Sequence, residues 1–429
     1  MQKIIIILSL CYFFIFHIHS VIYGEIDIKW QGTIDYSHIN YNKNDKTETP
    51  LAYDEINFFP KMDLSLSEFL HIGMEGDLRK SFQLDERTYS DFRELYFEIE
   101  YKNELIFKIG RQIIEWGRTD TIKPTNVFNV RDWTDLPLDI NIGINAFKFT
   151  RLLGMHELEF VYAPLFEVDR LPYLRKNRWF IFPLEDEGNT YIYDIEKNKA
   201  PGDINQFGLR FNYIGSGFDL ALVGAKIYDR VPTYFSKQVK NIDINKNEVL
   251  LQIMPYYKSI YLIGMNGAAT VSQYGFRSEL AYVLTEDNKN NNILIDDPYL
   301  QFVIGADHTF LDIIRDWDLF MLIQYALDKE LPVLGEENQE TESGKFKHFY
   351  RQAGLINSEF KFSEFKKIAI KGFRNLEKDD YIIKAEYIYK PVDVLEISIS
   401  AEYPGGRKDG FFGYFDRNDR IIAGIKYYY

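Results

Sequence analysis

Hydrophobic and polar residues alternate singly along most of the chain, a period of two that is typical of β-strands and not of helices. In the stretch 395–403, Leu, Ile, Ile, Ala and Tyr side chains alternate with Glu and Ser. The stretch 95–101 repeats the pattern, and so does 420–429, which ends on Tyr429. Each of these strands therefore has one apolar face, while its other face carries polar and charged side chains.

The alternation predicts about eighteen antiparallel strands of about ten residues each. The predicted strands lie at 25–36, 55–66, 70–79, 92–101, 104–113, 143–151, 155–163, 203–214, 217–227, 256–270, 275–285, 298–309, 316–327, 349–361, 365–374, 380–390, 393–403 and 420–429. Tight turns and long links follow each other in alternation. The span 248–275 has room for one strand or two, and we predict one because an even total keeps both termini at the same end.

The predicted fold class is all-β: residues 25–429 form a transmembrane antiparallel β-barrel with short periplasmic turns and long outer loops. A soluble β-sandwich would also alternate, but its apolar face would be a packed core and a chain of this length would contain domain linkers. No Pro/Gly/Ser-rich linker interrupts the sequence. A barrel of this size encloses an aqueous lumen. The predicted lumen wall carries both signs of charge, at Lys108, Arg210, Arg277, Glu279, Arg351, Lys384 and Glu386.

Residues 1–24 are predicted to be a signal peptide. A lysine precedes an apolar run at 4–16, which is too short to cross a bilayer as a helix. Cleavage is expected after Ser20 or Gly24. Removal of the peptide also removes the single cysteine, Cys11, so the mature chain is expected to contain no disulfide.

Charge and composition narrow the possible functions. The chain has 50 Lys and Arg residues against 64 Asp and Glu, a net charge of −14, which excludes a nucleic-acid partner. Only His38 and His348 are expected near the outer end of the barrel, and neither belongs to a hydrolase motif. Acidic runs such as 286–287 and 336–337 are interpreted as solvated loop tips. No enzymatic activity, cofactor or metal is predicted.

One long link, residues 114–142, breaks the alternation. Its charges and indoles are candidates for a pore constriction: Arg111 at its base, then Glu115, Trp116, Arg118, Asp120, Arg131, Asp132 and Trp133. Pro124 followed by Thr125 predicts a short helix over 126–132 with Thr125 as its N-cap. A bulge near Gly110 is predicted to turn Arg111 inward. The link either folds into the lumen as a constriction, which we favour, or caps the outer mouth through salt bridges.

Two motifs carry a family resemblance. The run KIGRQIIEWGRTD at 108–120, followed by RDW, and the closing FGYFDRNDRIIAGIKYYY resemble a large family of proteobacterial outer-membrane proteins whose substrate is unassigned. More distantly, the chain is similar to the alginate-export porin, also a large barrel. The resemblance implies passage of a solute through a pore, without naming the solute.

The favoured function is therefore an outer-membrane porin of a Gram-negative bacterium that passes small hydrophilic, anionic or amphipathic solutes by diffusion. The alternative is a non-conducting adhesin or structural barrel acting through loop 164–202, which contains a basic and aromatic patch at Arg170, Arg175, Lys176, Arg178 and Trp179. An outer-membrane hydrolase is less favoured. Expected partners are outer-membrane lipid, lipopolysaccharide and the barrel assembly machinery, for which Ile425, Tyr427 and Tyr429 form a candidate assembly signal.

Overall fold

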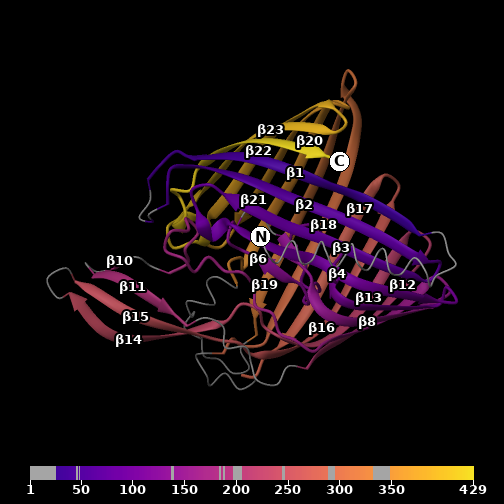
Figure 1. Ribbon diagram of the computed structural model, residues 1–429, viewed down its shortest axis with the longest axis horizontal. Helices are drawn as coiled ribbons and strands as arrows, with labels where there is room; N and C mark the ends of the chain where they lie inside the picture. The colour runs from indigo at the N-terminus through magenta and orange to yellow at the C-terminus, as the bar shows by residue number, and fades with distance from the viewer. Residues whose placement is uncertain are drawn as a thin grey trace.

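The structure is a computed structural model, and Figure 1 shows it as a ribbon. It describes residues 26–44, 47, 49–136, 140–182, 185–186, 189–196, 205–243, 247–287, 295–331 and 348–429. The predicted signal peptide and the acidic run at 336–337 lie outside these residues.

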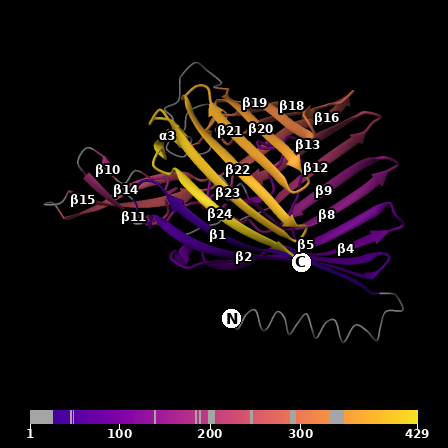
Figure 2. The ribbon, with the colours of Figure 1, turned by 90° about the horizontal axis from the view of Figure 1, so that it is seen from above.

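Eighteen strands pair antiparallel in one closed sheet, which confirms the predicted fold class (Figures 1 and 2). In order around the barrel they are β1 (Asp27–Tyr41), β2 (Ala52–Ser67), β3 (Leu70–Ser81), β4 (Tyr89–Tyr101), β5 (Leu105–Gln112), β8 (Ile144–Leu153), β9 (His156–Ala163), β12 (Gln206–Ile214), β13 (Phe218–Tyr228), β16 (Ser259–Val271), β17 (Tyr274–Leu284), β18 (Tyr299–Ile314), β19 (Trp317–Glu330), β20 (Gln352–Ser363), β21 (Lys366–Asn375), β22 (Asp380–Val392), β23 (Leu395–Gly406) and β24 (Arg420–Tyr428). Strand β24 closes the barrel against β1, with Tyr428 opposite Thr33 and Arg420 opposite Tyr41. Because every strand has two neighbours, no edge is left open.

The apolar face of the strands points outward. Ile399 is 52% exposed and Phe97 51%, whereas inward-facing Val303 is fully buried. A soluble β-sandwich would bury its apolar face in a core. An outer band of apolar side chains is favourable only where the surface contacts lipid, so the observation favours the transmembrane barrel over the sandwich. Within the described part of the chain, no helix is long and apolar enough to span a membrane.

Short turns lie at one end of the barrel and long segments at the other. The turn between β4 and β5 has Lys102 and Asn103 at positive φ, 53° and 54°, which suits a tight hairpin. At the opposite end the links extend to 164–205, between β9 and β12. The ambiguous span 248–275 contains one barrel strand, β16, as predicted; its first part forms β15 (Glu248–Tyr256) outside the barrel.

A four-stranded sheet at the loop end projects to the side of the barrel in Figure 1. It joins β10 (Glu185–Asp186) and β11 (Asn189–Ile195) from one long link to β14 (Thr233–Asp243) and β15 from the next, and β11 pairs with β15 in parallel. Phe180 and Phe182 are buried in one cluster with Ile253 of β15. The remaining small elements are the 3-10 turn η1 (Asp85–Arg87), the two-stranded sheet of β6 (Val130–Asp132) and β7 (Ile140–Ile142), and the helix α3 (Phe411–Tyr414).

The helix predicted over 126–132 is wrong. The segment has a turn at Pro124 and Thr125, and its end forms β6, paired with β7. The amide N–H of Thr125 donates to Glu279 of β17, so partners outside the segment satisfy backbone groups that a helix would have paired internally. Thr125 is therefore not an N-cap: its hydroxyl donates to the distant carboxylate of Glu279, whereas an N-cap hydroxyl accepts from a helix amide.

Candidate functional site

The described part of the link between β5 and β8 folds into the barrel and is here called the inserted segment (residues 113–136 and 140–143). Its apolar side chains Ile114, Trp116 and Phe128 are almost completely buried, and Trp116 meets Phe128 edge-on with ring centroids 5.1 Å apart. They pack in one cluster with inward-facing residues of five barrel strands, namely Val161, Val223, Leu262, Ala281 and Tyr299. The indole reaches the wall because β12 has Gly208 there: a Cβ at that position would lie 2.7 Å from the Trp116 ring.

Glu279 of β17 is the main polar anchor of the inserted segment. One of its carboxylate oxygens accepts hydrogen bonds from the amides of Arg118 and Thr119 and from the Thr119 hydroxyl, at 2.6–2.7 Å. The other accepts from the amide and hydroxyl of Thr125, at 3.0 and 2.7 Å. A buried carboxylate with several donors is well satisfied, so Glu279 fixes two turns of the segment at once. The sequence predicted Glu279 on the lumen wall but gave no sign of this role.

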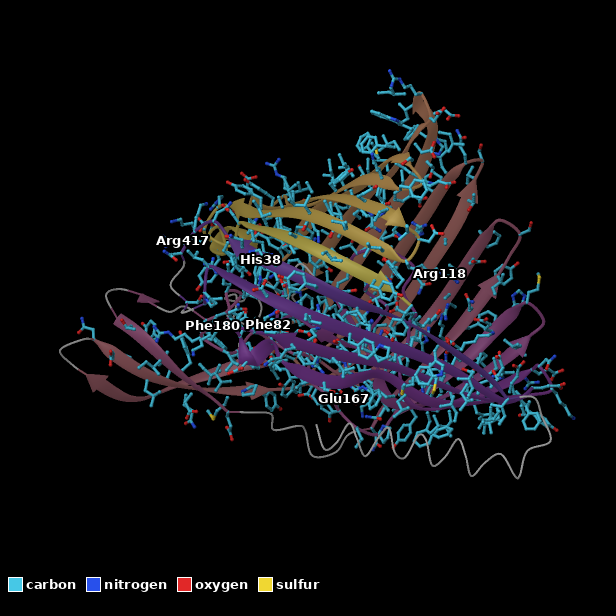
Figure 3. The ribbon with its side chains drawn as sticks, turned by 45° about the horizontal axis from the view of Figure 1, so that its top comes forward. His38, Phe82, Arg118, Glu167, Phe180 and Arg417 are labelled. Carbon is cyan, nitrogen blue, oxygen red and sulfur yellow. The ribbon has the colours of Figure 1, made fainter. Side chains whose placement is uncertain are left out.

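Arg118 fixes the segment against the same side of the wall. Its guanidinium donates to Asn266 of β16 at 3.0 Å and to Asn212 of β12 at 2.5 Å, and it pairs with Asp219 of β13 at 3.3 Å. The Trp116 indole N–H donates to Glu159 of β9 at 3.0 Å. Figure 3 places Arg118 within the span of the barrel strands, away from Phe180 and the projecting sheet. One face of the inserted segment is thus bound to the wall from β9 to β17.

A second anchor ties the far end of the segment to the closing strands. Asp135 accepts two hydrogen bonds from the guanidinium of Arg420 on β24, at 2.8 and 3.0 Å, and lies 3.4 Å from Arg87. Arg420 also donates to Glu402 of β23 at 2.6 Å. Burial disfavours the charged form of Asp135, but the positive charges of Arg420 and Arg87 outweigh it and lower the pKa of Asp135 to about 2. The carboxylate is therefore ionised at any ordinary pH.

The predicted constriction residues have different surroundings. Glu115 lies 3.3 Å from Lys123, and Asp120 lies 2.9 Å from Arg277 of β17. Asp132 accepts from the hydroxyls of Tyr89 and Thr134. Two side chains, Arg131 and Trp133, lie together, with the guanidinium 5.5 Å from the ring centroid, and the Trp133 indole N–H donates to Asp169 at 2.8 Å.

Arg111 does not lie on a bulge of its own strand. The pairing of β5 with β4 and with β8 runs through Gly110 without a register shift, so the predicted bulge is wrong. The irregularity lies in the neighbouring pair, between Glu75 and Gly76 where β3 meets β4. Arg111 stays in register opposite Asn145 and forms an ion pair with Glu167 at 2.7 Å. Its partner comes from the next long link, which the alternation pattern could not indicate.

Most of the predicted wall residues are engaged in pairs within the sheet. Arg210 pairs with Glu159, Lys108 with Glu98, and Lys384 with Glu402, at 3.0, 3.0 and 3.3 Å. Two further positions differ in setting: Arg351 precedes β20 and pairs with Glu330 at 3.0 Å, while Glu386 lies opposite Ala369 and Ser400.

A cavity of about 460 Å³ remains between the inserted segment and the wall formed by β18 to β22. Its lining includes Arg131 and Trp133 from the segment and Lys371 and Lys384 from neighbouring strands. Aromatic and aliphatic side chains cover much of the rest: Ile122, Val127, Tyr299, Leu322, Phe349, Tyr350, Leu355, Phe373, Ile382 and Phe412. Lys371 lines the cavity but was not predicted as a lumen residue from the sequence. The alternation along β21 could have indicated it, because Lys371 lies on the same face of the strand as Ala369 and Phe373.

The basic and aromatic patch predicted for loop 164–202 is divided: Lys176 is exposed and Arg170 and Arg175 are half-buried, but the other two residues are not at the surface. Arg178 and Trp179 are buried, and the Trp179 ring lies 5.0 Å from that of Phe415. The Arg178 guanidinium donates to the backbone carbonyl of Arg417 at 3.0 Å. This part of the loop therefore packs on the β23–β24 connection, so Arg178 and Trp179 do not belong to the surface patch that the adhesin alternative invoked.

Comparison with known proteins gives a family and a fold. The model of a family described as a protein of unknown function, DUF1302, matches residues 144–393. No curated protein matches the chain. OccK11 (OpdR) of Pseudomonas aeruginosa is similar in structure, with a TM-score of 0.50, 9% identity, and coverage of 94% of this chain and 96% of that one. At such low identity this likeness shows the fold alone.

Two further structures are similar with TM-scores below 0.5. One is a porin of Rhodopseudomonas blastica, with a TM-score of 0.44, 9% identity, and coverage of 94% and 100% of the two chains. The other is Wzi of Escherichia coli, described as a carbohydrate-binding β-barrel involved in capsule assembly, with a TM-score of 0.49, 9% identity, and coverage of 92% and 83%. The comparisons give no support to the more distant resemblance to the alginate-export porin.

Proposed function

The chain belongs to the DUF1302 family of proteins of unknown function, and from that premise we propose that it is an outer-membrane channel for small solutes. The observation that carries the proposal is the inserted segment, which is anchored to the wall from β9 to β17 and again at β24, and leaves a cavity beside β18 to β22. A wide barrel needs an internal element to become selective, and a segment anchored at Glu279 and at Arg420 supplies one.

The preferred solutes are small anions and amphipathic molecules. Several carboxylates in the lumen are already paired with arginines, as in Asp135 with Arg420 and Asp120 with Arg277. Arg131 lines the cavity and forms no ion pair or side-chain hydrogen bond with any residue that the structure describes. A fork-shaped guanidinium in a confined, partly desolvated space attracts anions more strongly than it would in bulk water.

Single-channel recording in planar bilayers tests this role of the segment. Deletion of residues 118–135 removes the contacts to Glu279 and Arg420, so conductance should rise severalfold. Arg131→Ala should shift ion selectivity toward cations, and Arg407→Ala should not, because Arg407 lies on the surface and pairs with Asp409. A deleted barrel that inserts normally and conducts like the parent would exclude the segment as the constriction.

A second candidate is a surface barrel that binds a partner without conducting. The four-stranded sheet of β10, β11, β15 and β14 favours it, because this sheet projects beside the barrel and takes no part in the cavity (Figure 1). An absence of conductance in the parent protein would favour this alternative.

We also propose that the protein lies in the outer membrane and is not an enzyme. A barrel with an apolar outer band suits the outer membrane of a Gram-negative bacterium, with lipid, lipopolysaccharide and the assembly machinery as partners. We propose no enzymatic activity: His348 is buried and pairs with Asp328 at 2.8 Å, and His38 pairs with Asp54 at 2.9 Å near the loop end. Within the described ranges, no group of three or more His, Cys, Asp or Glu residues could hold a metal ion.

A further inference from the structure

We propose that the cavity between the inserted segment and β18–β22 is a binding site for an amphipathic carboxylate, a molecule with an apolar body and one anionic group. It rests on the proposed channel only in that the solute must reach the cavity through the lumen. A cavity of about 460 Å³ falls within the range of small-molecule sites in proteins. The chemistry of its lining defines the class of ligand.

The anionic group is assigned to two cations that form no ion pair with any residue that the structure describes. Lys371 of β21 faces the cavity, and its neighbours across the sheet are Asn357 on one side and Lys384 on the other. Two lysines directly opposite each other repel, and only Lys384 is offset, by Glu402 at 3.3 Å. Among the described residues no carboxylate pairs with Lys371, and Arg131 across the cavity is likewise unpaired.

The acidic residues at the same cavity, Asp120, Asp169 and Asp229, have partners of their own, although Asp169 also feels the charge of Arg131. Asp120 accepts from Gln324 and pairs with Arg277. Asp169 accepts from the backbone amide of Arg131 and from the Trp133 indole, at 2.9 and 2.8 Å. The lining carries more positive than negative residues, with Lys123, Arg131, Arg230, Lys371 and Lys384 against Asp120, Asp169 and Asp229. A ligand carboxylate can offset this excess through contact with Lys371 and with the Arg131 guanidinium.

The apolar body is assigned to the aromatic end of the cavity. Phe349 contacts the rings of Tyr350, Phe373 and Phe412, with centroids 5.1–6.1 Å apart, and Ile122 of the inserted segment packs in the same cluster. Phe373 belongs to β21, Phe349 and Tyr350 precede β20, and Phe412 lies on α3. Burial of a ligand's apolar surface against these rings is favourable. A ring or short chain at the aromatic end places its carboxylate toward Lys371.

Equilibrium dialysis of 3-phenylpropionate against the folded protein in detergent tests the proposal, with empty micelles as the blank. We expect saturable binding, and much weaker binding of the uncharged 3-phenylpropanol and of acetate. Lys371→Gln removes one charge-assisted contact and should weaken binding about tenfold. Lys367→Gln is the matched control, four residues earlier on the same face of β21, because Lys367 is already paired with Glu359 at 3.1 Å.

The outcomes separate the site from the channel. Equal binding of the acid and the alcohol, or equal loss in the two lysine variants, would overturn the proposal. Conductance without saturable binding of 3-phenylpropionate would also overturn it and leave the channel intact. Saturable, Lys371-dependent binding to a protein that does not conduct would support the site and contradict the proposed channel. Heat-modifiability of each variant verifies that the barrel is folded, and Arg131→Gln provides an independent second variant.

Discussion

At the scale of single residues, buried carboxylates decide where the inserted segment lies. Glu279 accepts five hydrogen bonds from three residues of the segment, Arg118, Thr119 and Thr125. Asp135 reaches the opposite wall through Arg420. Each anchor joins residues more than a hundred positions apart, and each would cost free energy if it lost its partner, because a buried charge or donor would be left unsatisfied.

Glu279→Gln should loosen the segment without unfolding the barrel. The substitution keeps the side chain's size but places an amide where two oxygens accepted, at a cost of about 1.5–3 kcal/mol. We expect faster tryptic cleavage after Arg118 and larger conductance fluctuations, with unchanged heat-modifiability. Glu359→Gln, also on the lumen side, is the control because Glu359 pairs with Lys367 and not with the segment. Identical proteolysis of the two variants would contradict the role of Glu279.

The pH dependence follows from the lowered pKa of Asp135. The pKa of about 2 lies below the ordinary value of about 3.9, so the stabilisation from Asp135 is present above about pH 4 and is lost as the pH falls through about 2. Conductance controlled by this anchor should therefore stay constant from neutral pH to about pH 4. Asp135→Asn should show the altered conductance already at neutral pH. A wild-type transition near pH 5 that the variant abolishes would contradict this assignment.

At the scale of elements, strands were predictable and the segment between β5 and β8 was not. The alternation of apolar and polar residues is a local property of each strand. It can be read from the sequence because every barrel strand has one face toward lipid and the other toward the lumen. The segment's form depends on distant partners: Thr125 donates to Glu279 and no helix forms. The bulge expected at Gly110 is absent from β5 and an irregularity occurs instead between β3 and β4, because strand register is a property of pairs and not of one strand.

The last strand is predicted to act in assembly. Ile425 and Tyr427 are exposed on the outer face, and the backbone of Tyr429 exchanges hydrogen bonds with Gly32, both at 3.2 Å. Deletion of 427–429 removes part of the β24–β1 seam as well as the terminal aromatic. We expect lower levels of folded protein in outer-membrane fractions, and a smaller decrease for Tyr429→Ala, which keeps the backbone pairs. Unchanged amounts of heat-modifiable protein for both variants would count against an assembly role.

At the scale of the whole molecule, the outer surface determines the solvent. Large apolar side chains such as Trp30, Leu222 and Ile263 are at least 55% exposed around the barrel. In water this band would drive aggregation, whereas in lipid it is satisfied, and the polar backbone is paired all round the closed sheet.

The protein is accordingly expected to fold only in detergent or lipid. Circular dichroism should show a β-rich spectrum with little helix, and the band on a gel should shift on heating as the barrel unfolds. Purification of a folded, monodisperse monomer without detergent would contradict this prediction.

The sequence alone determined the architecture of the barrel: the number of strands, their alternating connections, the outward apolar face and the choice of one strand within 248–275. Those features repeat every two residues and need no knowledge of distant contacts. The tertiary structure alone decided the interior. Three features depend on which strands the closed sheet brings around one lumen: the choice of Glu279 and Arg420 as anchors, the burial of Arg178 and Trp179, and the lack of an ion pair at Lys371 and Arg131 among the described residues. The alternation along a strand determines whether a side chain points into the barrel. Its neighbours across the lumen are determined only when the sheet closes.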